Sequence, residues 1–257
     1  SFDQDYIIIE ADSTAGNHTV SLHVKIKPGT PQRAKKVYTI NEVYIFPGYR
    51  LSAQKSDTLK ADAEYYKGYY VVDKHKNYKP QMFAQSMQFN PGDVYNRKDH
   101  NQSISRLVNL GIFKFVKNRF EPVEDPDSAR LNVYYYLTSL PKKSLRADIN
   151  GNTKSNNLTG SGITIGWRNR NTFRGGELLS VNATAGFEIQ YSGQLKGFNT
   201  YRGGLETRLI FPRFLVPFIK LNTRSGFVPK TNMLLAYDML TKEKLYTMNS
   251  FRGEFGY

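Results

Sequence analysis

The side chains able to act as acids, bases or metal ligands are few. The sequence has four histidines, His18, His23, His75 and His100, and no cysteine. His18 and His23 lie in or beside a predicted hairpin, and His75 and His100 fall in unrelated segments, so no set has the spacing of a metal site. We interpret each histidine as a surface or packing residue. Without cysteine there is no thiol nucleophile, disulfide or Cys-based zinc or iron–sulfur site.

Motifs for other common reactions are also missing from the sequence. We find no phosphate-binding glycine-rich loop, no Gly-x-Ser-x-Gly elbow and no His-Glu-x-x-His. Asp125 and Asp127 flank Pro126, which is typical of a turn and not of paired catalytic acids. We therefore expect no enzyme, no catalytic residue, no metal site and no cofactor.

Charge and texture change along the chain. Residues 142–257 hold 17 basic and 7 acidic side chains, against 19 and 15 in residues 1–141. The second part also has more Gly, Asn and Thr and long alternating runs. Such a step predicts a domain boundary near Pro141. No run of about 18 apolar residues exists, which excludes a transmembrane helix, whereas the strands of a membrane β-barrel are only half apolar.

The second part contains strands too long for an ordinary globular sheet. From Leu178 to Tyr191 apolar and polar residues alternate, over about 46 Å at about 3.3 Å per residue. A globular strand averages about five or six residues, and a strand that crosses a membrane needs about 9–11. We expect the apolar side to face lipid, through Leu179, Val181, Phe187 and Ile189.

Five further segments alternate in the same way. Their apolar faces are formed by Leu145, Ala147 and Ile149; by Ile163, Ile165 and Trp167; by Tyr201, Leu205, Leu209 and Phe211; by Met233, Leu235 and Tyr237; and by Phe251, Phe255 and Tyr257. Arg and Glu on the opposite face suit a water-filled or plugged lumen. A soluble sandwich or lipocalin-like barrel shows the same period with its apolar face inward. Strand length and the charged face favour the membrane.

Six strands cannot close a membrane barrel, because bacterial barrels begin at about eight strands. Six open strands would also expose two edges and an apolar face. We therefore expect further strands beyond Tyr257. The start at Ser1, without a signal peptide and close to a strand-like run over residues 6–12, likewise predicts a piece of a longer protein.

The first part predicts small α+β units. Residues 6–12 and 19–27 form two strand-like runs, which cannot be stable alone, so we interpret residues 1–34 as the end of a preceding domain. Residues 35–141 predict the order β-α-α-β-β. Strands are expected over residues 37–46, 113–120 and 130–139, with an irregular insertion at 47–78.

Local signals place the two helices of this unit. Pro80 suits the first turn of one helix, where its missing N–H costs nothing. Asn96 can cap the other, with Asp99 in its first turn and Gly111 at its end.

The turn and helix motifs resemble a known family. The segments Phe89-Asn90-Pro91-Gly92-Asp93-Val94-Tyr95 and Leu107-Val108-Asn109-Leu110-Gly111-Ile112-Phe113 resemble a polypeptide-transport-associated (POTRA) domain, whose pattern is a "pGd.y" turn, a helix, "L..lG.f" and two strands. The resemblance covers residues 35–141, and residues 1–34 resemble the last strands of a preceding copy. The insertion at 47–78 departs from the short form of the family.

A POTRA domain that runs directly into a barrel resembles the BamA/TamA superfamily of outer-membrane insertases, including its TamL-like members. The segment 169–177 resembles the family's early strand turn. The late Arg-Gly-Phe/Tyr motif is absent from the sequence, and Arg252-Gly253-Glu254 is a poor substitute. The resemblance implies α+β POTRA domains followed by antiparallel transmembrane β-barrel strands, the first six of them in residues 142–257. It also implies the outer membrane of a Gram-negative bacterium, with the POTRA part in the periplasm.

The resemblance implies an assembly and insertion factor for outer-membrane proteins. Its partners would be unfolded outer-membrane protein clients, periplasmic or lipoprotein accessory subunits, and outer-membrane lipid. A client would add to an edge strand of the POTRA domain formed by Phe113, Lys114, Phe115, Val116, Lys117, Asn118, Arg119 and Phe120. It would also add to a lateral seam at the first barrel strand, formed by Leu145, Arg146, Ala147, Asp148, Ile149, Asn150 and Gly151.

Two other functions are consistent with the sequence. The same architecture serves polypeptide translocation pores of the two-partner-secretion kind. The net charge of +14 raises polyanion binding as a third reading. Because the basic residues alternate along strands and do not cluster on a helix or loop, we expect no nucleic-acid partner.

Overall fold

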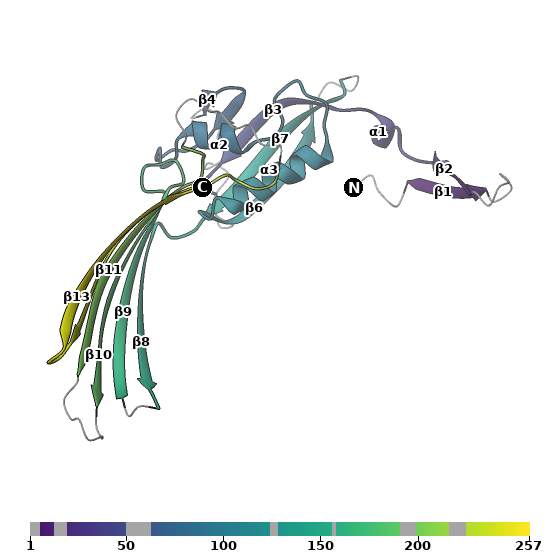
Figure 1. Ribbon diagram of the computed structural model, residues 1–257. Helices are drawn as coiled ribbons and strands as arrows, with labels where there is room; N and C mark the ends of the chain where they lie inside the picture. Colours follow the sequence, from purple (N-terminus) through teal and green to yellow (C-terminus); the bar gives the residue numbers. More distant parts are fainter. Residues whose placement is uncertain are drawn as a thin grey trace.

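The computed structural model describes residues 6–12, 20–49, 63–123, 128–155, 158–190, 199–215 and 225–257. Within them the protein is mostly antiparallel β-sheet with few helices, arranged as a two-stranded, a five-stranded and a six-stranded sheet. Figure 1 shows the six long strands extending away from the α+β part, with the two-stranded hairpin to one side. No helix among these residues is long and apolar enough to cross a membrane.

The hairpin consists of β1 (Ile7–Asp12) and β2 (Ser21–Ile26), which pair antiparallel with Ile7 opposite Ile26. Both strands were expected from the sequence. A single turn of helix, α1 (Gln32–Lys35), follows the hairpin and leads into the next unit.

The five-stranded sheet has the order β4-β5-β3-β7-β6. Its elements are β3 (Thr39–Phe46), β4 (Glu64–Tyr66), β5 (Tyr69–Val71), α2 (Pro80–Ser86), α3 (Arg97–Asn109), β6 (Phe113–Pro122) and β7 (Arg130–Ser139). The main core lies between the sheet and the two helices, where Ile45, Phe83, Leu107, Tyr135 and Leu137 are fully buried.

The helix signals in the sequence are confirmed. Pro80 occupies the first turn of α2. The Asn96 side chain caps α3 by accepting a 2.8 Å hydrogen bond from the backbone N–H of Lys98, and Asp99 lies in the first turn. Gly111 follows the helix with φ of 70°, a backbone conformation that favours glycine.

The expectation of an irregular insertion at 47–78 is wrong in part. Residues 64–71 form the hairpin β4–β5, which turns through Lys67 and Gly68, and β5 adds parallel to β3 with Tyr69 beside Val43. Tyr44 stacks on Tyr70 across this pairing, with ring centroids 5.0 Å apart. Each strand has only three residues, too few for alternation to be visible in the sequence.

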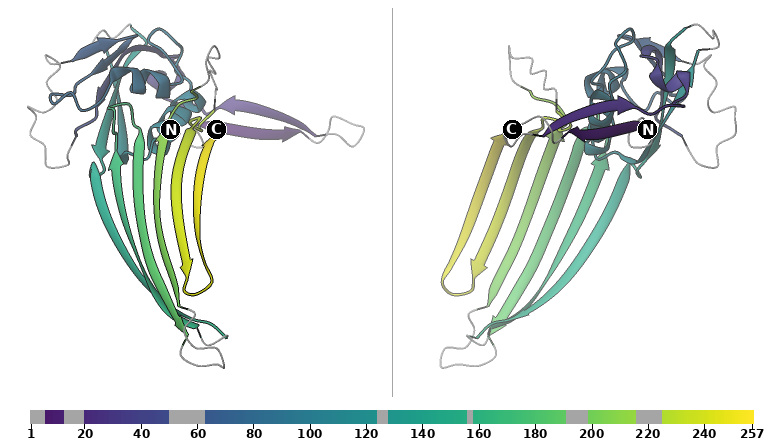
Figure 2. Two further views of the ribbon diagram at one scale, coloured as in Figure 1. Left: turned by 60° about the vertical axis from the view of Figure 1, so that its left-hand side comes forward. Right: turned by 90° about the vertical axis from the view of Figure 1, so that its right-hand side faces the viewer.

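The six-stranded sheet is a simple up-and-down meander. Its strands are β8 (Lys143–Thr153), β9 (Leu158–Arg170), β10 (Leu178–Gln190), β11 (Thr200–Phe211), β12 (Thr231–Lys242) and β13 (Tyr246–Gly256). All six predicted strands are present, with 11 to 13 residues each. Figure 2 shows that they bend together as one curved sheet.

The register keeps every predicted apolar position on one face. One row crosses all six strands through directly opposed residues, Ala147, Ile165, Ala183, Leu205, Tyr237 and Phe251. All are odd-numbered, and the even-numbered residues form the polar face. Side chains on the apolar face are widely exposed, with Ile149 79% and Phe251 83% accessible.

The first of these strands is longer than the sequence suggested. We expected a short strand ending near Gly151 because Asn and Gly have weak strand propensity. The strand runs on to Thr153, and its last residues keep register with β9, with Asn150 opposite Gly162. The hydroxyl of Ser161 also donates to the carbonyl of Asn150 at 3.1 Å. Cross-strand pairing therefore outweighs local propensity here.

Candidate functional site

The strand β6 forms one edge of the five-stranded sheet. It pairs with β7 on one side, with Val116 opposite Leu137, and no described strand pairs with its other side. The predicted edge strand from Phe113 to Phe120 lies wholly within it. An edge with unpaired N–H and C=O groups can accept an added strand from another chain.

Two features of β6 limit permanent pairing. The register shifts between Phe113 and Phe115, so that Lys114 has no direct partner on β7. Irregularities and exposed Lys residues both discourage edge-to-edge aggregation. Lys114 also lies over the ring of the half-exposed Phe115, 5.2 Å from its centroid. Whether a client binds this edge stays a prediction.

The strand β8 forms one edge of the six-stranded sheet and contains all of the predicted seam residues. It pairs only with β9 among the described strands, and β13 forms the other edge. Leu145 and Ile149 project from its apolar face and are exposed. On the polar face Arg146 and Asp148 form an exposed ion pair at 2.8 Å. The role of this edge as a seam also stays a prediction.

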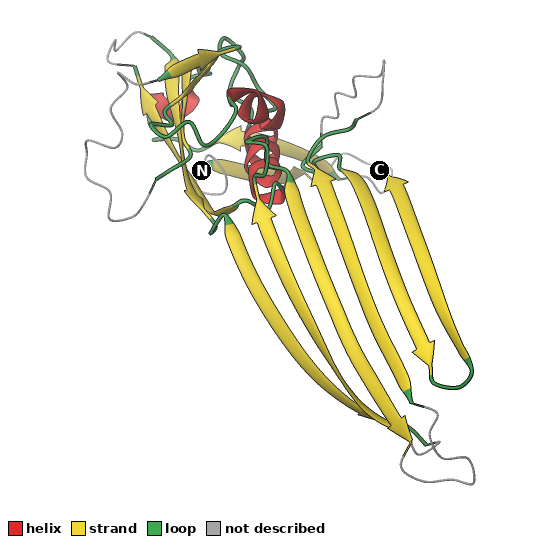
Figure 3. Ribbon diagram, turned by 90° about the vertical axis from the view of Figure 1, so that its left-hand side faces the viewer, coloured by secondary structure: helices red, strands yellow, loops and turns green. Residues whose placement is uncertain are grey.

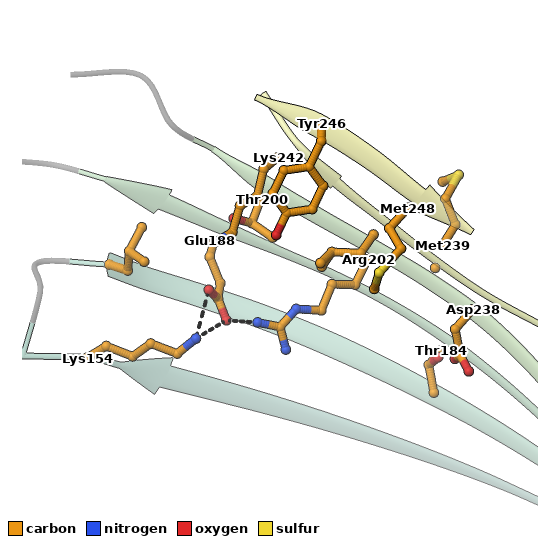
Figure 4. A pocket seen from close by; sticks show the side chains of 13 residues that line it. Lys154, Thr184, Glu188, Thr200, Arg202, Asp238, Met239, Lys242, Tyr246 and Met248 are labelled. Carbon is orange, nitrogen blue, oxygen red and sulfur yellow. Dashed lines mark hydrogen bonds and ion pairs between the residues drawn. The ribbon is translucent and has the colours of Figure 1, made fainter. Parts of the chain in front are cut away.

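A buried carboxylate organises the far end of the polar face. Glu188 on β10 accepts hydrogen bonds from Lys154 at 2.8 Å and from Arg202 at 2.7 Å, as Figure 4 shows. Asn152 also donates to it at 3.3 Å. These residues come from the region of β8, from β10 and from β11, and line a hollow of about 590 Å³.

A second cluster lies nearer the middle of the same face. Glu206 on β11 pairs with Arg252 on β13 at 3.1 Å, although β12 lies between the two strands. The residue between them on β12 is Ala236, whose small side chain leaves space for the pair. Arg208 also approaches Glu206, at 3.5 Å. This cluster borders a hollow of about 350 Å³.

Glycines on the polar face make room for these polar side chains. A Cβ at Gly162 would lie 2.6 Å from Oδ1 of Asn150, and one at Gly166 would lie 2.9 Å from Oδ1 of Asn182. Gly160 is covered in the same way by Glu188. The polar groups therefore lie close against the sheet and leave the face hollowed.

The turn between β9 and β10 joins the two large sheets. Asn171 donates a 2.8 Å hydrogen bond to the carbonyl of Asn77, and the carbonyl of Arg174 accepts one from the N–H of Lys79 at 2.7 Å. Glu177 is fully buried behind this turn and accepts from the N–H of Gly175 at 2.9 Å. The segment 169–177 was singled out in the sequence, but its contact with the α+β unit was not foreseen.

A second contact joins α3 to the segment before β12. Asn109 donates to the carbonyl of Gly226 at 3.0 Å, and Arg106 donates to that of Ser225 at 3.4 Å. Val228 packs against the main core of the α+β unit. Figure 3 shows α3 beside the ends of the long strands. The two contacts fix the α+β unit to one end of the six-stranded sheet.

The histidines do not come together. His100 is buried, with Nδ1 2.9 Å from the hydroxyl of Tyr135, and burial lowers its pKa to about 4. His23 and His75 are exposed on separate elements, while His18 lies outside the described residues, as do Asp125 and Asp127. Among the residues that the structure describes, no three His, Asp or Glu side chains are placed to hold a metal ion.

No protein-family model and no curated protein matches the chain. Three solved structures are similar. BamA from Haemophilus ducreyi, lacking POTRA domains 1–3, is 10% identical, with 97% of this chain and 47% of that chain covered and a TM-score of 0.37. CdiB from Acinetobacter baumannii is 11% identical, with 97% and 50% covered and a TM-score of 0.43. POTRA1–3 of the periplasmic domain of Omp85 from Anabaena is 16% identical, with 52% and 42% covered and a TM-score of 0.29.

The chain spans about half the length of these structures or less. At these identities and TM-scores the similarities have no weight for function, which must come from the geometry of the chain itself.

Proposed function

We propose that this chain is part of an outer-membrane protein of the BamA/TamA (Omp85) superfamily, with TamL-like members as its nearest type. In this proposal the six-stranded sheet is part of a transmembrane barrel and the α+β unit is a periplasmic POTRA domain. The protein receives unfolded outer-membrane clients and assists their entry into the membrane. Periplasmic or lipoprotein subunits would assist it.

The observation that carries this proposal is the division of the six-stranded sheet into two faces. Its odd-numbered face is apolar and exposed along 11–13-residue strands, while its even-numbered face holds the Glu188 and Glu206 ion pairs in hollows. A soluble sandwich would bury the apolar face against a second sheet. An apolar face toward lipid and a polar face toward a lumen are typical of membrane barrels.

The two free edges suggest how a client would be handled. The edge of β6 offers backbone groups to an extended segment in the periplasm. The edge of β8 would pair with a closing strand, because six strands do not complete a barrel. If that pairing has few hydrogen bonds it can open at modest cost, since each bond contributes about 0.5–1.5 kcal/mol net. The opened edge would then template a client strand within the membrane.

Client insertion into vesicles tests this proposal. Vesicles that contain the full-length protein should fold an added client barrel faster than empty vesicles, measured by protease protection of the client. A rate equal to that in empty vesicles would contradict an insertase.

A translocation pore is the second candidate, and the hollowed polar face favours it. Fixed charges that line hollows on a predicted lumen suit the passage of a polar chain. A pore would conduct ions across a planar bilayer and export its partner while β8 stays paired. The two functions therefore differ in whether the β8 edge contacts the client.

A further inference from the structure

A cavity of about 680 Å³ lies where the five-stranded sheet meets the first strands of the six-stranded sheet. Its walls come from the end of β3, the segment after β5, the end of β7, and the junctions at the start of β8 and the end of β9. Ligand sites commonly have about 300–1,000 Å³. The cavity is separate from the hollows of the polar face, and neither client edge uses it.

The cavity is lined by more positive than negative charge. Lys74, Lys142 and Arg170 line it, together with a single carboxylate, that of Asp73. This carboxylate already accepts a 2.8 Å hydrogen bond from the backbone N–H of Tyr78, within its own loop. The remaining charge favours an anionic ligand.

Arg170 is held in place by the protein. Its Nη1 donates to the carbonyl of Pro141 at 3.1 Å and to the hydroxyl of Ser144 at 3.4 Å. Its backbone N–H donates to the carbonyl of Lys142 at 2.7 Å, so the two cationic residues are neighbours across the β8–β9 pairing. A guanidinium has five N–H donors, more than these contacts use. A fixed guanidinium beside an ammonium is well suited to a phosphate.

Apolar side chains form much of the remaining wall. Phe46, Val72, Ile112 and Leu140 line the cavity beside the cations. This combination suits a ligand with an anionic head and a carbon body.

The cavity lies at the level where the apolar face of the long strands begins. Leu145, which is 72% exposed on that face, follows Lys142 by three residues. If the apolar face meets lipid, Lys142 stands at the headgroup level, where basic residues attract anionic lipids. This step rests on the proposed function.

We propose that the cavity binds the phosphate group of an anionic glycerophospholipid. Arg170 and Lys142 contact the phosphate, and the apolar wall contacts the glycerol and the first carbons of the acyl chains. The bound lipid would fill the junction between the α+β unit and the barrel.

Native mass spectrometry of the full-length protein in neutral detergent, with added phosphatidylglycerol, tests this site. Lys142→Gln removes one cation. Gly48→Phe fills the cavity without strain, because Gly48 lines it and a Cβ there would meet nothing within 4 Å. Lys98→Gln is the matched control, since it makes the same charge change on the exposed surface of α3.

The expected result is about tenfold weaker phosphatidylglycerol binding for Lys142→Gln and for Gly48→Phe, with Lys98→Gln unchanged. Unchanged binding in both cavity variants would overturn the proposal. Equal weakening in Lys98→Gln would also overturn it, since the lipid would then follow net charge and not the cavity.

Inorganic phosphate and glycerol 3-phosphate separate lipid from soluble phosphate compounds. We expect either to bind more weakly than phosphatidylglycerol because neither contacts the apolar wall. Binding as tight as that of the lipid would overturn the lipid assignment in favour of a soluble phosphate ligand. The measurement needs no client, so loss of lipid binding with client insertion intact would refute this site alone.

Discussion

The side-chain nitrogen of Asn171 donates a 2.8 Å hydrogen bond to the carbonyl oxygen of Asn77, and this contact joins the two large sheets. The same carboxamide accepts a 2.9 Å hydrogen bond from the N–H of Gly176, which closes the β9–β10 turn. Asn171 has φ of 62°, a conformation that asparagine tolerates better than most residues. One side chain thus holds the turn and fixes it to the α+β unit.

Replacing Asn171 by glycine should loosen the junction. Glycine keeps the left-handed backbone without strain but removes both hydrogen bonds, each with a net value of about 0.5–1.5 kcal/mol. Spin labels on Lys98→Cys and Asn249→Cys, in an otherwise thiol-free chain, should report a broader distance distribution. A distribution as narrow as in the parent would show that the remaining contacts hold the unit alone.

The two faces of β10 should respond differently to charge. Ala183→Arg should cost about 2–4 kcal/mol of folding free energy in a bilayer, because it places a cation on the lipid face near the middle of the strand. Asn182→Arg, one residue earlier on the polar face, is the matched control and should cost far less. Urea titration in lipid vesicles measures both variants. Equal costs would contradict the assignment of the faces.

A thiol at Ala183 gives an independent check. In the otherwise cysteine-free chain, Ala183→Cys should react with a maleimide confined to the lipid phase, and Thr184→Cys should not. The reverse pattern would place the apolar face inside a soluble barrel.

Much of the six-stranded sheet could be predicted from the sequence because alternation has a period of two and needs no tertiary information. The row from Ala147 to Phe251 follows directly from it. The pairs Glu206–Arg252 and Glu188–Lys154 could not be predicted, because each bridges strands that are not neighbours and depends on the register of three.

The junction was hidden for a similar reason. Asn171 and Asn77 are 94 residues apart, and their contact depends on how two sheets dock. The hairpin β4–β5 escaped because strands of three residues have no visible period. The cap at Asn96 was predictable because capping is local.

Proline in β6 should weaken client binding. Successive residues of a strand direct their N–H groups to opposite sides, so of Val116→Pro and Lys117→Pro one removes a donor toward β7 and the other removes a donor toward the free edge. The variant that keeps its melting temperature should lose client crosslinking at β6. Full crosslinking in that variant would show that β6 does not bind the client by strand addition.

The buried His100 should make the α+β unit sensitive to acid. Burial lowers its pKa to about 4 from 6.5, so the folded state favours the neutral ring. Its contribution to stability is complete above about pH 6.5 and is lost as the pH falls toward 4, by up to about 3 kcal/mol. The ring lies against Tyr95, Phe120 and Tyr135, which supply no nearby carboxylate to offset the burial.

Replacement of His100 by glutamine isolates this effect. Glutamine can still hydrogen-bond the hydroxyl of Tyr135 but does not titrate in this range. Chemical denaturation between pH 7 and 4.5 should show a smaller loss of stability in His100→Gln than in the parent. Equal slopes would assign the acid sensitivity to other groups.

The central claim is that a client strand pairs with the β8 edge within the membrane. Disulfide trapping tests it most directly, with Ala147→Cys at that edge, Thr184→Cys on the polar face of β10, and a cysteine in the edge strand of a client barrel. During insertion the account predicts a disulfide to Ala147→Cys, and with neighbouring client cysteines a yield that alternates along the strand. Disulfides confined to Thr184→Cys, with none at Ala147→Cys, would contradict the claim and identify a chain that passes through the lumen.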